Sequence, residues 1–264
     1  MTVAEALRGA GIDARDARIL LAAATGFSDA SVIAFPERTL AAEAAARFAD
    51  FAARRRRGEP VAYIVGEQEF YGLRLSVNPA VLIPRPETEL LVDLALARDF
   101  SAMADLGSGC GAIALAVKHA RPKTRVVAVE ASAAALAVAK RNAVRYGVDI
   151  DWRHGRWCEP LGAERFELIL ANPPYVAAGD PHLAALVYEP TQALVAGADG
   201  LDAIRTIVAQ APEHLAAGGW LLLEHGLGQD RAVRELLTAR GLADVRTWPD
   251  LAGIPRVSGG KAVK

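Results

Sequence analysis

The chain has 264 residues, of which 52% are hydrophobic and 23% charged, so it can bury a large core and is not a disordered chain. Thirty basic residues against 31 acidic ones leave a formal charge of −1, which argues against non-specific binding to a nucleic acid backbone. Apolar runs stay below the roughly 18 residues of a membrane span, and the first residues lack a signal-peptide layout. We therefore expect a cytoplasmic enzyme that does not bind membranes.

The cysteines and histidines do not form a metal-binding pattern. Cys110 and Cys158 are too few for a disulfide framework or a zinc site, and the five histidines lack the spacing of metal ligands. We expect two reduced thiols and no metal.

Residues 1–58 are predicted to be helical throughout. Apolar residues recur at helical spacing, without the alternation typical of strands, in segments that begin near Ala4 and that span 13–24 and 40–57. Breaks are predicted at Gly11, Gly26 and Pro36. The pattern indicates a small helical bundle. The arginine run 54–57 suits the negative end of the last helix, although a partner contact would also explain it.

Residues 59–84 are predicted to be a linker that contains a β-hairpin. Gly58-Glu59-Pro60 interrupts the last helix, and residues 61–84 are β-branched, aromatic and turn-rich. The run Phe70-Tyr71-Gly72-Leu73 predicts the hairpin. Pro84-Arg85-Pro86-Glu87 then predicts the start of a helix, because proline and acidic residues suit the first helical turn.

Residues 85–264 alternate predicted strands and helices. Such alternation indicates an α/β fold with a mostly parallel, doubly wound sheet. The expected strands are Ala102–Leu106, Arg125–Glu130, Ile150–Arg153, Phe166–Ala171 and Trp220–Glu224. The expected helices span 112–120, 133–146, 201–216 and 229–239.

A glycine-rich loop follows the first of these strands. The run 105–111, Asp-Leu-Gly-Ser-Gly-Cys-Gly, lets the backbone turn sharply and approach a ligand closely. Its spacing is neither the dinucleotide fingerprint nor a P-loop. Glu130, at the end of the next strand, can accept hydrogen bonds from both hydroxyls of a ribose. The ligand that matches is S-adenosylmethionine, whose ammonium group Asp105 can meet directly or through water. A plain strand–helix turn is the alternative.

Asn172-Pro173-Pro174-Tyr175 follows the strand 166–171 and is expected beside the glycine loop, because ligands bind at the carboxyl ends of parallel strands. The Asn172 side-chain oxygen and the Pro173 carbonyl can accept from one NH₂ group, and the Tyr175 ring can stack on a planar amide or base. Two acceptors would hold a delocalised nitrogen against the methyl sulfonium. The tetrapeptide therefore indicates an N-methyltransferase, with a strand-terminating turn as the alternative.

Together these motifs resemble one family. Arg85-Pro86-Glu87-Thr88-Glu89, the loop 105–115, the Asn-Pro-Pro-Tyr run and the segments 221–226 and 250–256 are similar to the HemK/PrmC family of peptide chain release factor N(5)-glutamine methyltransferases. The resemblance covers nearly the whole chain. It implies methylation of the glutamine in the Gly-Gly-Gln motif of class 1 release factors, which modulates translation termination.

The resemblance also implies a class I methyltransferase sheet of seven strands with an antiparallel last hairpin, and it implies site residues. Catalytic residues would be Asn172, Pro173 and Tyr175, and Pro174 would join them in binding substrate. Cofactor residues would be Asp105, Gly107, Ser108, Gly109, Cys110, Gly111, Glu130, Trp157 and Asn172. The chain departs from the family where Glu130 replaces the common Asp and where Arg156 precedes Trp157, so Trp157 is alternatively a core residue.

Two other functions remain as alternatives. An N6-adenine methyltransferase shares the Asn-Pro-Pro-Tyr motif, but residues 1–60 hold nine arginines and eight acidic residues, which is not a DNA-reading surface. A binding module without catalysis would not need both Asn172 and the glycine loop. We expect a monomer in which residues 1–58 recognise the release factor, and a purely folding-related role for them is the alternative.

Overall fold

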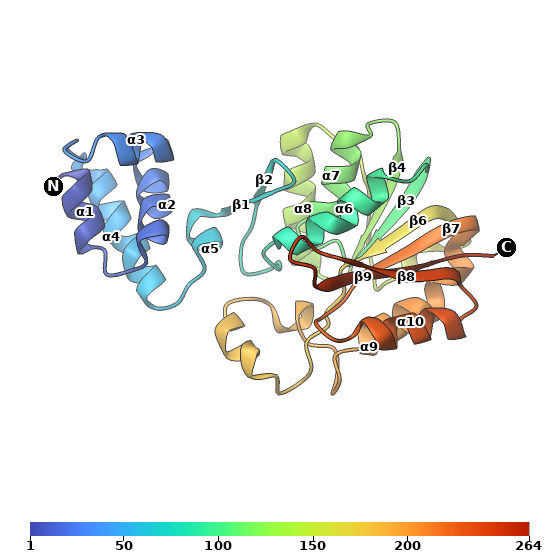
Figure 1. Ribbon diagram of the computed structural model, residues 1–264. Coiled ribbons are helices and arrows are strands. Elements are labelled where there is room, and N and C mark those ends of the chain that lie inside the picture. The colour runs from blue at the N-terminus through green and yellow to red at the C-terminus, as the bar shows by residue number, and fades with distance from the viewer. Residues whose placement is uncertain (264) are drawn as a thin grey trace. The chain divides into compact units, whose positions relative to one another are not determined.

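The computed structural model describes residues 1–263 and divides the chain into two compact units, residues 1–67 and the part from Gln68 onward (Figure 1). No helix within the described residues is both long and apolar enough to cross a membrane.

The first unit is a bundle of short helices. Their bounds are α1 Val3–Gly9, α2 Ala14–Thr25, α3 Asp29–Ala34, α4 Ala42–Arg56 and α5 Val61–Val65. The N-caps explain where several of them begin, since Thr2, Asp13 and Ser28 each accept a backbone hydrogen bond from the first turn. The core contains Leu20, Leu21, Phe48 and Ile64, all at most 5% exposed. The predicted helical character of this region is confirmed, and α3 adds a helix between the segments for which bounds were predicted.

Residues 61–65 lie in the predicted linker, for which no helix was expected. They form helix α5, which ends at Gly66 in the left-handed conformation. The β-branched composition favoured a strand, but tertiary packing decided otherwise, because Ile64 lies in the core of the helical bundle. The predicted hairpin is present immediately afterwards, as β1 Glu67–Phe70 and β2 Leu73–Ser76.

The second unit contains a seven-stranded sheet in the order β5-β4-β3-β6-β7-β9-β8. All of its paired strands are parallel except at β9, which runs antiparallel to β7 and β8. The strands are β3 Ala102–Leu106, β4 Arg125–Glu130, β5 Asp151–His154, β6 Phe166–Ala171, β7 Leu215–Glu224, β8 Ala243–Pro249 and β9 Pro255–Lys261. The expected doubly wound sheet with an antiparallel last hairpin is confirmed.

Helices cover both faces of this sheet (Figure 1). One layer is formed by α6 Glu89–Leu96, α7 Ala112–Ala120 and α8 Ala133–Tyr146, and the other by α9 Asp202–Gln210 and α10 Asp230–Ala239. Short 3₁₀ turns lie at η1 Pro86–Thr88, η2 Glu159–Leu161, η3 Pro181–Leu186, η4 Thr191–Ala193 and η5 Ala211–His214. The core between sheet and helices is almost entirely aliphatic.

Most element boundaries match the sequence predictions, with local shifts. The helix expected over 201–216 ends at Gln210, because Pro212 redirects the chain into η5 and β7 already begins at Leu215. Strand β5 is displaced by one residue from the expected 150–153. Strand β7 is longer than the predicted 220–224, since the glycine pair 218–219 continues the strand instead of ending it.

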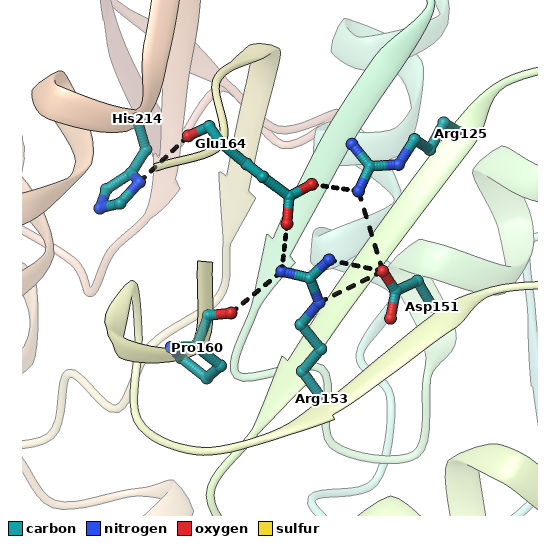
Figure 2. A network of polar contacts seen from close by, with 6 residues as sticks. All are labelled: Arg125, Asp151, Arg153, Pro160, Glu164 and His214. Atoms are coloured by element: carbon teal, nitrogen blue, oxygen red, sulfur yellow. Dashed lines mark hydrogen bonds and ion pairs between the residues drawn. The ribbon is translucent and has the colours of Figure 1, made fainter. Parts of the chain in front are cut away.

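A charged network ties the amino ends of the strands together (Figure 2). Arg153 pairs with Asp151 at 2.6 Å and with Glu164 at 2.5 Å, while Arg125 contacts both of these acids. The groups are partly exposed, so each pair adds little stability. The network nevertheless joins β4, β5 and the loop before β6 at the edge opposite the carboxyl ends, which leaves the other edge free for a ligand.

Candidate active site

The sheet order reverses between β3 and β6, and this switch point positions the predicted motifs. From β3 the chain crosses to β4 and β5 on one side, whereas β6 continues to β7 on the other. Leu106 pairs with Ala171 in parallel register, so the residues that follow them, Gly107 and Asn172, leave the same edge side by side. Crevices at such switch points bind ligands in open α/β sheets.

The glycine loop has the sharp backbone turns predicted from its sequence. Gly107, Gly109 and Gly111 have φ angles of +78°, +57° and +88°. These values are strained for other residues. The N–H groups of Gly107 and Ser108 donate to the Val129 carbonyl at 2.8 and 3.0 Å, which ties the loop to β4.

Glu130 lies at the end of β4 and faces this loop. One carboxylate oxygen accepts from the Gly109 N–H and the other from the Ser132 N–H, each at 2.8 Å. Each oxygen keeps a lone pair for a further donor. Glu130 therefore holds the loop in place and still presents an acceptor surface.

Asp105 is completely buried at the end of β3. Its Oδ2 accepts from the Ala114 N–H in the first turn of α7 at 3.2 Å, and its Oδ1 has no protein partner. Burial raises the pKa of Asp105 to about 7, and the charge of Glu130 adds to the rise, while the Ala114 hydrogen bond opposes it. A cation near Oδ1 would stabilise the ionised form.

A cavity of about 740 Å³ lies at this edge of the sheet. Six of the predicted site residues line it, namely Gly107, Gly109, Glu130, Trp157, Asn172 and Pro174. Asp105, Ser108, Cys110, Gly111, Pro173 and Tyr175 are not among its lining residues. All six lie within two positions of a lining residue in the chain, so they shape the cavity wall or adjoin it. The opposite wall consists of 80–82 and 190–197, which the sequence did not identify.

Trp157 combines core packing with a place in the cavity wall. Its backbone has φ +49°, which is rare outside glycine, and its ring atom Cζ3 would lie 3.0 Å from a Cβ on Gly107. Its indole Nε1 is buried without a partner. A strained backbone that delivers a ring to a cavity is typical of a ligand contact.

Two side-chain hydrogen bonds hold the Asn-Pro-Pro-Tyr segment in place, one at Asn172 and one at Tyr175. The Asn172 Nδ2 group donates to the Thr88 hydroxyl at 2.9 Å, which leaves its carbonyl oxygen Oδ1 available. The Tyr175 hydroxyl donates to Glu224 Oε1 at 3.4 Å. Tyr175 therefore points its hydroxyl to the end of β7, and its predicted stacking on a substrate stays a prediction.

Glu224 and His225 end β7 as a pair of buried polar residues. Burial raises the pKa of Glu224 to about 7, while the hydroxyls of Thr88 and Tyr175 lower it. His225 bonds Ser258 at 2.9 Å, and burial lowers its pKa. β7 ends at Glu224, as predicted, and Glu224 contacts Tyr175 of the Asn-Pro-Pro-Tyr segment, whereas His225 follows the strand.

Three residues that the sequence did not single out hold the site together. Asn142 on α8 donates to the Cys110 carbonyl at 3.0 Å and accepts from the Ser76 N–H, which attaches the loop to the hairpin. Glu189 accepts from the Ile83 N–H and the Arg85 guanidinium, and so joins the two segments of the far wall. Gln229 donates to the Tyr175 carbonyl at 3.0 Å. A single asparagine or glutamate in a sequence carries no signal for such long-range contacts.

Buried polar atoms without a partner gather at this site. Among the described residues, buried side-chain atoms without a hydrogen bond are Asp105 Oδ1, Ser108 Oγ, Trp157 Nε1 and Glu224 Oε2. Buried polar groups are normally satisfied, so each exception needs an explanation. Trp157 lines the cavity, Asp105 and Ser108 lie within two positions of Gly107, and Glu224 leaves the sheet beside Asn172. These exceptions therefore indicate a polar ligand at this edge of the sheet. The two cysteines, in contrast, are buried thiols whose pKa burial raises to about 12, which keeps them unreactive.

The sheet order and the glycine loop define a class I, S-adenosylmethionine-dependent methyltransferase. Solved structures share this fold: a methyltransferase from Pyrococcus furiosus has a TM-score of 0.58 at 16% identity, covering 81% of this chain and 98% of that one. A 16S rRNA N2 G1207 methyltransferase of T. thermophilus, solved with AdoMet and guanosine, has a TM-score of 0.55 at 22% identity, covering 74% of this chain and 49% of that one. A family model for a methyltransferase small domain matches residues 86–199.

Closer relatives narrow this class to one family. The PrmC N-terminal domain model matches residues 2–66. The release factor glutamine methyltransferase of Pseudomonas aeruginosa is 52% identical, over 93% of this chain and 91% of that protein. The release factor glutamine methyltransferase of Burkholderia pseudomallei is 50% identical, over 98% of this chain and 96% of that protein. The chain belongs to the release factor glutamine methyltransferase family.

The residues in and next to the cavity fit the cofactor of this family. S-adenosylmethionine carries an ammonium group, ribose hydroxyls and an adenine ring. Asp105 Oδ1 is a buried acceptor without a partner, Glu130 retains lone pairs at the cavity wall, and Trp157 places an aromatic ring there. Each class of group on the cofactor thus has a matching residue.

Proposed function

We propose that this chain transfers a methyl group from S-adenosylmethionine to the side-chain amide nitrogen of the glutamine in the Gly-Gly-Gln motif of class 1 peptide chain release factors. Family membership supports the reaction. The observation that carries the assignment to this site is the orientation of Asn172, whose Nδ2 is engaged by Thr88 so that Oδ1 remains an acceptor beside the cavity. An acceptor is what a primary amide nitrogen requires.

We assign the cofactor to the cavity wall formed by β3 and β4. Glu130 would accept from the ribose hydroxyls, the glycine loop would contact the amino-acid part, and Asp105 would stabilise its ammonium group through Oδ1. Trp157 would line the adenine side, in agreement with its strained backbone and its position against Gly107. Ser108, Cys110 and Gly111 would act by shaping the loop, because they do not line the cavity.

The mechanism depends on alignment and electrostatics. When bound, the cofactor would supply a methyl group activated by a sulfonium, and S-adenosylhomocysteine would be the product. The methylated nitrogen would lose one proton to water or through Asn172. Asn172 Oδ1 and the Pro173 carbonyl would accept both hydrogens of the substrate NH₂ group and hold its nitrogen in line with that methyl group. Positive charge develops on the nitrogen during transfer, and the two acceptor dipoles favour it. Proline at 173 and 174 removes backbone N–H donors that would compete for these acceptors.

We assign the protein substrate, and not a nucleic acid, on the charge of the first unit. Residues 1–60 carry nine arginines and eight acidic residues, a net charge of +1, and several of the arginines are already paired. Arg54 pairs with Glu59 at 2.5 Å and Arg55 with Asp16 at 2.7 Å. Such a surface lacks the positive stripe that tracks a phosphate backbone. We expect the enzyme to act as a monomer in the cytoplasm.

We assign release factor recognition to the helical unit, with the domains at 1–58, 59–84 and 85–264. The catalytic cavity needs to admit one glutamine side chain, and a few contacts around it do not select one protein among many. A second contact surface is therefore required, and the helical bundle is large enough to supply it.

The experiment that tests the proposed function offers labelled S-adenosylmethionine with purified release factor and with DNA, in parallel reactions. Label is expected in the release factor only, and peptide mapping should place it on the Gly-Gly-Gln glutamine. Label in the DNA would favour the adenine methyltransferase alternative, and label in neither would contradict the proposed function.

A further inference from the structure

The end of β7 brings a buried carboxylate next to the substrate motif. Ala171 pairs with Leu223 in parallel register, so the following residues, Asn172 and Glu224, emerge together at the carboxyl edge of the sheet. Glu224 is 1% exposed and its Oε2 has no hydrogen-bond partner. Burying an acid without a full set of hydrogen-bond partners costs stability, and a function at this position would explain why it is kept.

Thr88 lies between these two residues. It is 4% exposed, at the end of η1, and its hydroxyl accepts from Asn172 Nδ2 at 2.9 Å. Because the Asn172 Nδ2 group is the donor in this contact, a lone pair of the Thr88 hydroxyl faces Asn172 and its single hydrogen is left for another acceptor. We infer that this acceptor is Glu224, which leaves the sheet beside Asn172 and whose Oε2 has no partner.

The order of donors determines which way the Asn172 amide faces. With a Thr88 lone pair directed to Asn172, the amide turns its NH₂ group to Thr88 and its oxygen away. The reversed amide would place an NH₂ group against the NH₂ group of a glutamine substrate, so that two donors would meet. It would also leave the Thr88 lone pair facing the amide oxygen. Supporting residues that fix a ligand-contacting side chain in this way commonly change activity by about 10- to 100-fold when removed.

We propose that Thr88 and Glu224 are positioning residues that hold the Asn172 amide with Oδ1 toward the substrate nitrogen. The proposal rests on the function proposed above. Neither Thr88 nor Glu224 lines the cavity, so we expect neither to touch the methyl group or the glutamine. They act through Asn172, and the Tyr175 hydroxyl, 3.4 Å from Glu224 Oε1, attaches the other end of the tetrapeptide to the same carboxylate.

The test measures single-turnover methylation of release factor by wild type, Thr88→Val, Thr88→Ser and Asn172→Ala, and by the double variant Thr88→Val/Asn172→Ala. Valine keeps the shape of threonine without its hydroxyl, and serine keeps the hydroxyl. We expect Thr88→Val to lose about 10- to 100-fold in rate with unchanged cofactor affinity by calorimetry, and Thr88→Ser to recover most of the rate. In the Asn172→Ala background, Thr88→Val should cause no further loss, because its effect passes through Asn172.

Glu224→Gln provides a second variant that preserves shape and keeps an oxygen to accept from Thr88. Its loss should be smaller than that of Thr88→Val. A normal rate in Thr88→Val, or losses that multiply in the double variant, would overturn the positioning role. The role would also be overturned if Glu224→Gln were inactive while Thr88→Val was normal, since the carboxylate would then act by itself.

The same series separates this inference from the proposed function. A wild-type enzyme that binds cofactor without methylating the release factor would contradict the proposed function, and a normal rate in Asn172→Ala would contradict the role of Asn172. An inactive Asn172→Ala beside a normal Thr88→Val overturns only the positioning role.

Discussion

The side-chain nitrogen of Asn172 lies 2.9 Å from the Thr88 hydroxyl, and this hydrogen bond joins residues 84 positions apart in the chain. Thr88 ends the 3₁₀ turn η1, and Asn172 directly follows β6 at the centre of the sheet. The contact therefore couples the Pro-Glu-Thr turn directly to the Asn-Pro-Pro-Tyr segment. It gives the turn a role in orienting the acceptor.

We expect the Glu130→Ala variant to bind the cofactor more weakly than the wild type. Glu130→Ala removes the proposed ribose acceptor and also the carboxylate that holds Gly109 and Ser132. Hydrogen bonds to charged groups contribute about 1.5–3 kcal/mol, so we expect the dissociation constant to rise by at least about 10-fold. The rate at saturating cofactor should change less, because ribose contacts are similar in ground and transition states. Unchanged affinity in calorimetry would show that another residue holds the ribose.

Asp105 predicts that cofactor affinity depends on pH. Burial and the charge of Glu130 raise its pKa to about 7, so the free enzyme loses this proton near neutral pH. The ammonium group favours the ionised form, so affinity should increase from about pH 6 to about pH 8 and fall as the carboxylate is protonated. Calorimetry across this range should give a flat profile for Asp105→Asn. An equal slope in both proteins would assign the pH dependence to another group.

The same pKa predicts an opposite trend in the stability of the free enzyme. A carboxyl whose folded-state pKa lies above its ordinary value of 3.8 contributes stability that is present below that value and is lost as pH rises through about 7. His225 opposes this trend, because burial lowers its pKa. The difference between wild type and Asp105→Asn isolates the Asp105 contribution. Urea unfolding should show that, relative to wild type, Asp105→Asn is more stable at about pH 8 than at about pH 5.

A side chain at position 107 is expected to collide with Trp157 in the cavity wall. A Cβ at Gly107 would lie 3.0 Å from the Trp157 ring, and the residue has φ +78°. Gly107→Ala should therefore displace Trp157, weaken cofactor binding and change the indole fluorescence. Gly147→Ala is the matched control, because Gly147 has φ +61° with no atom within 4 Å of its Cβ position, and it does not line the cavity. The control should lose about 1–2 kcal/mol of stability from backbone strain alone and keep its cofactor affinity.

If the first unit recognises the release factor, its deletion should affect whole release factor more than a short peptide substrate. Because Ile64 on α5 belongs to the core of that unit, the deletion should remove residues 1–66 and not end at residue 58. The truncated enzyme should bind cofactor normally and show a raised KM for whole release factor, with a much smaller change for a short Gly-Gly-Gln peptide. Equal losses on both substrates in a folded deletion variant would leave the unit a structural role only.

Local patterns predicted most of the fold because local rules dominate there. The strands β3, β4 and β6 have the predicted boundaries, since each is a short apolar run bounded by turn residues. Helix α5 was missed because packing overrode the β-branched composition of 61–65. Strands β8 and β9 were expected only from the family resemblance, because polar residues interrupt both runs.

Within the site, the sequence identified residues that lie on motifs and missed those that act across distance. Glu130 is the last residue of β4 and Asn172 directly follows β6, and the order of the strands brings both residues to the cavity. The sequence indicated Thr88 only as part of a family motif and Glu224 only as the end of a strand. Their relation depends on the register of β6 and β7, which places Ala171 beside Leu223. The register between two strands cannot be predicted from one sequence alone.

The proposed role of Asn172 is to hold the glutamine amide for methyl transfer. Its most direct test is single-turnover methylation of a purified release factor by Asn172→Ala, with cofactor affinity measured by calorimetry on the same preparation. Loss of one positioned acceptor should reduce the rate by about 10²- to 10³-fold while S-adenosylmethionine still binds. A rate close to that of wild type at full cofactor occupancy would contradict the account.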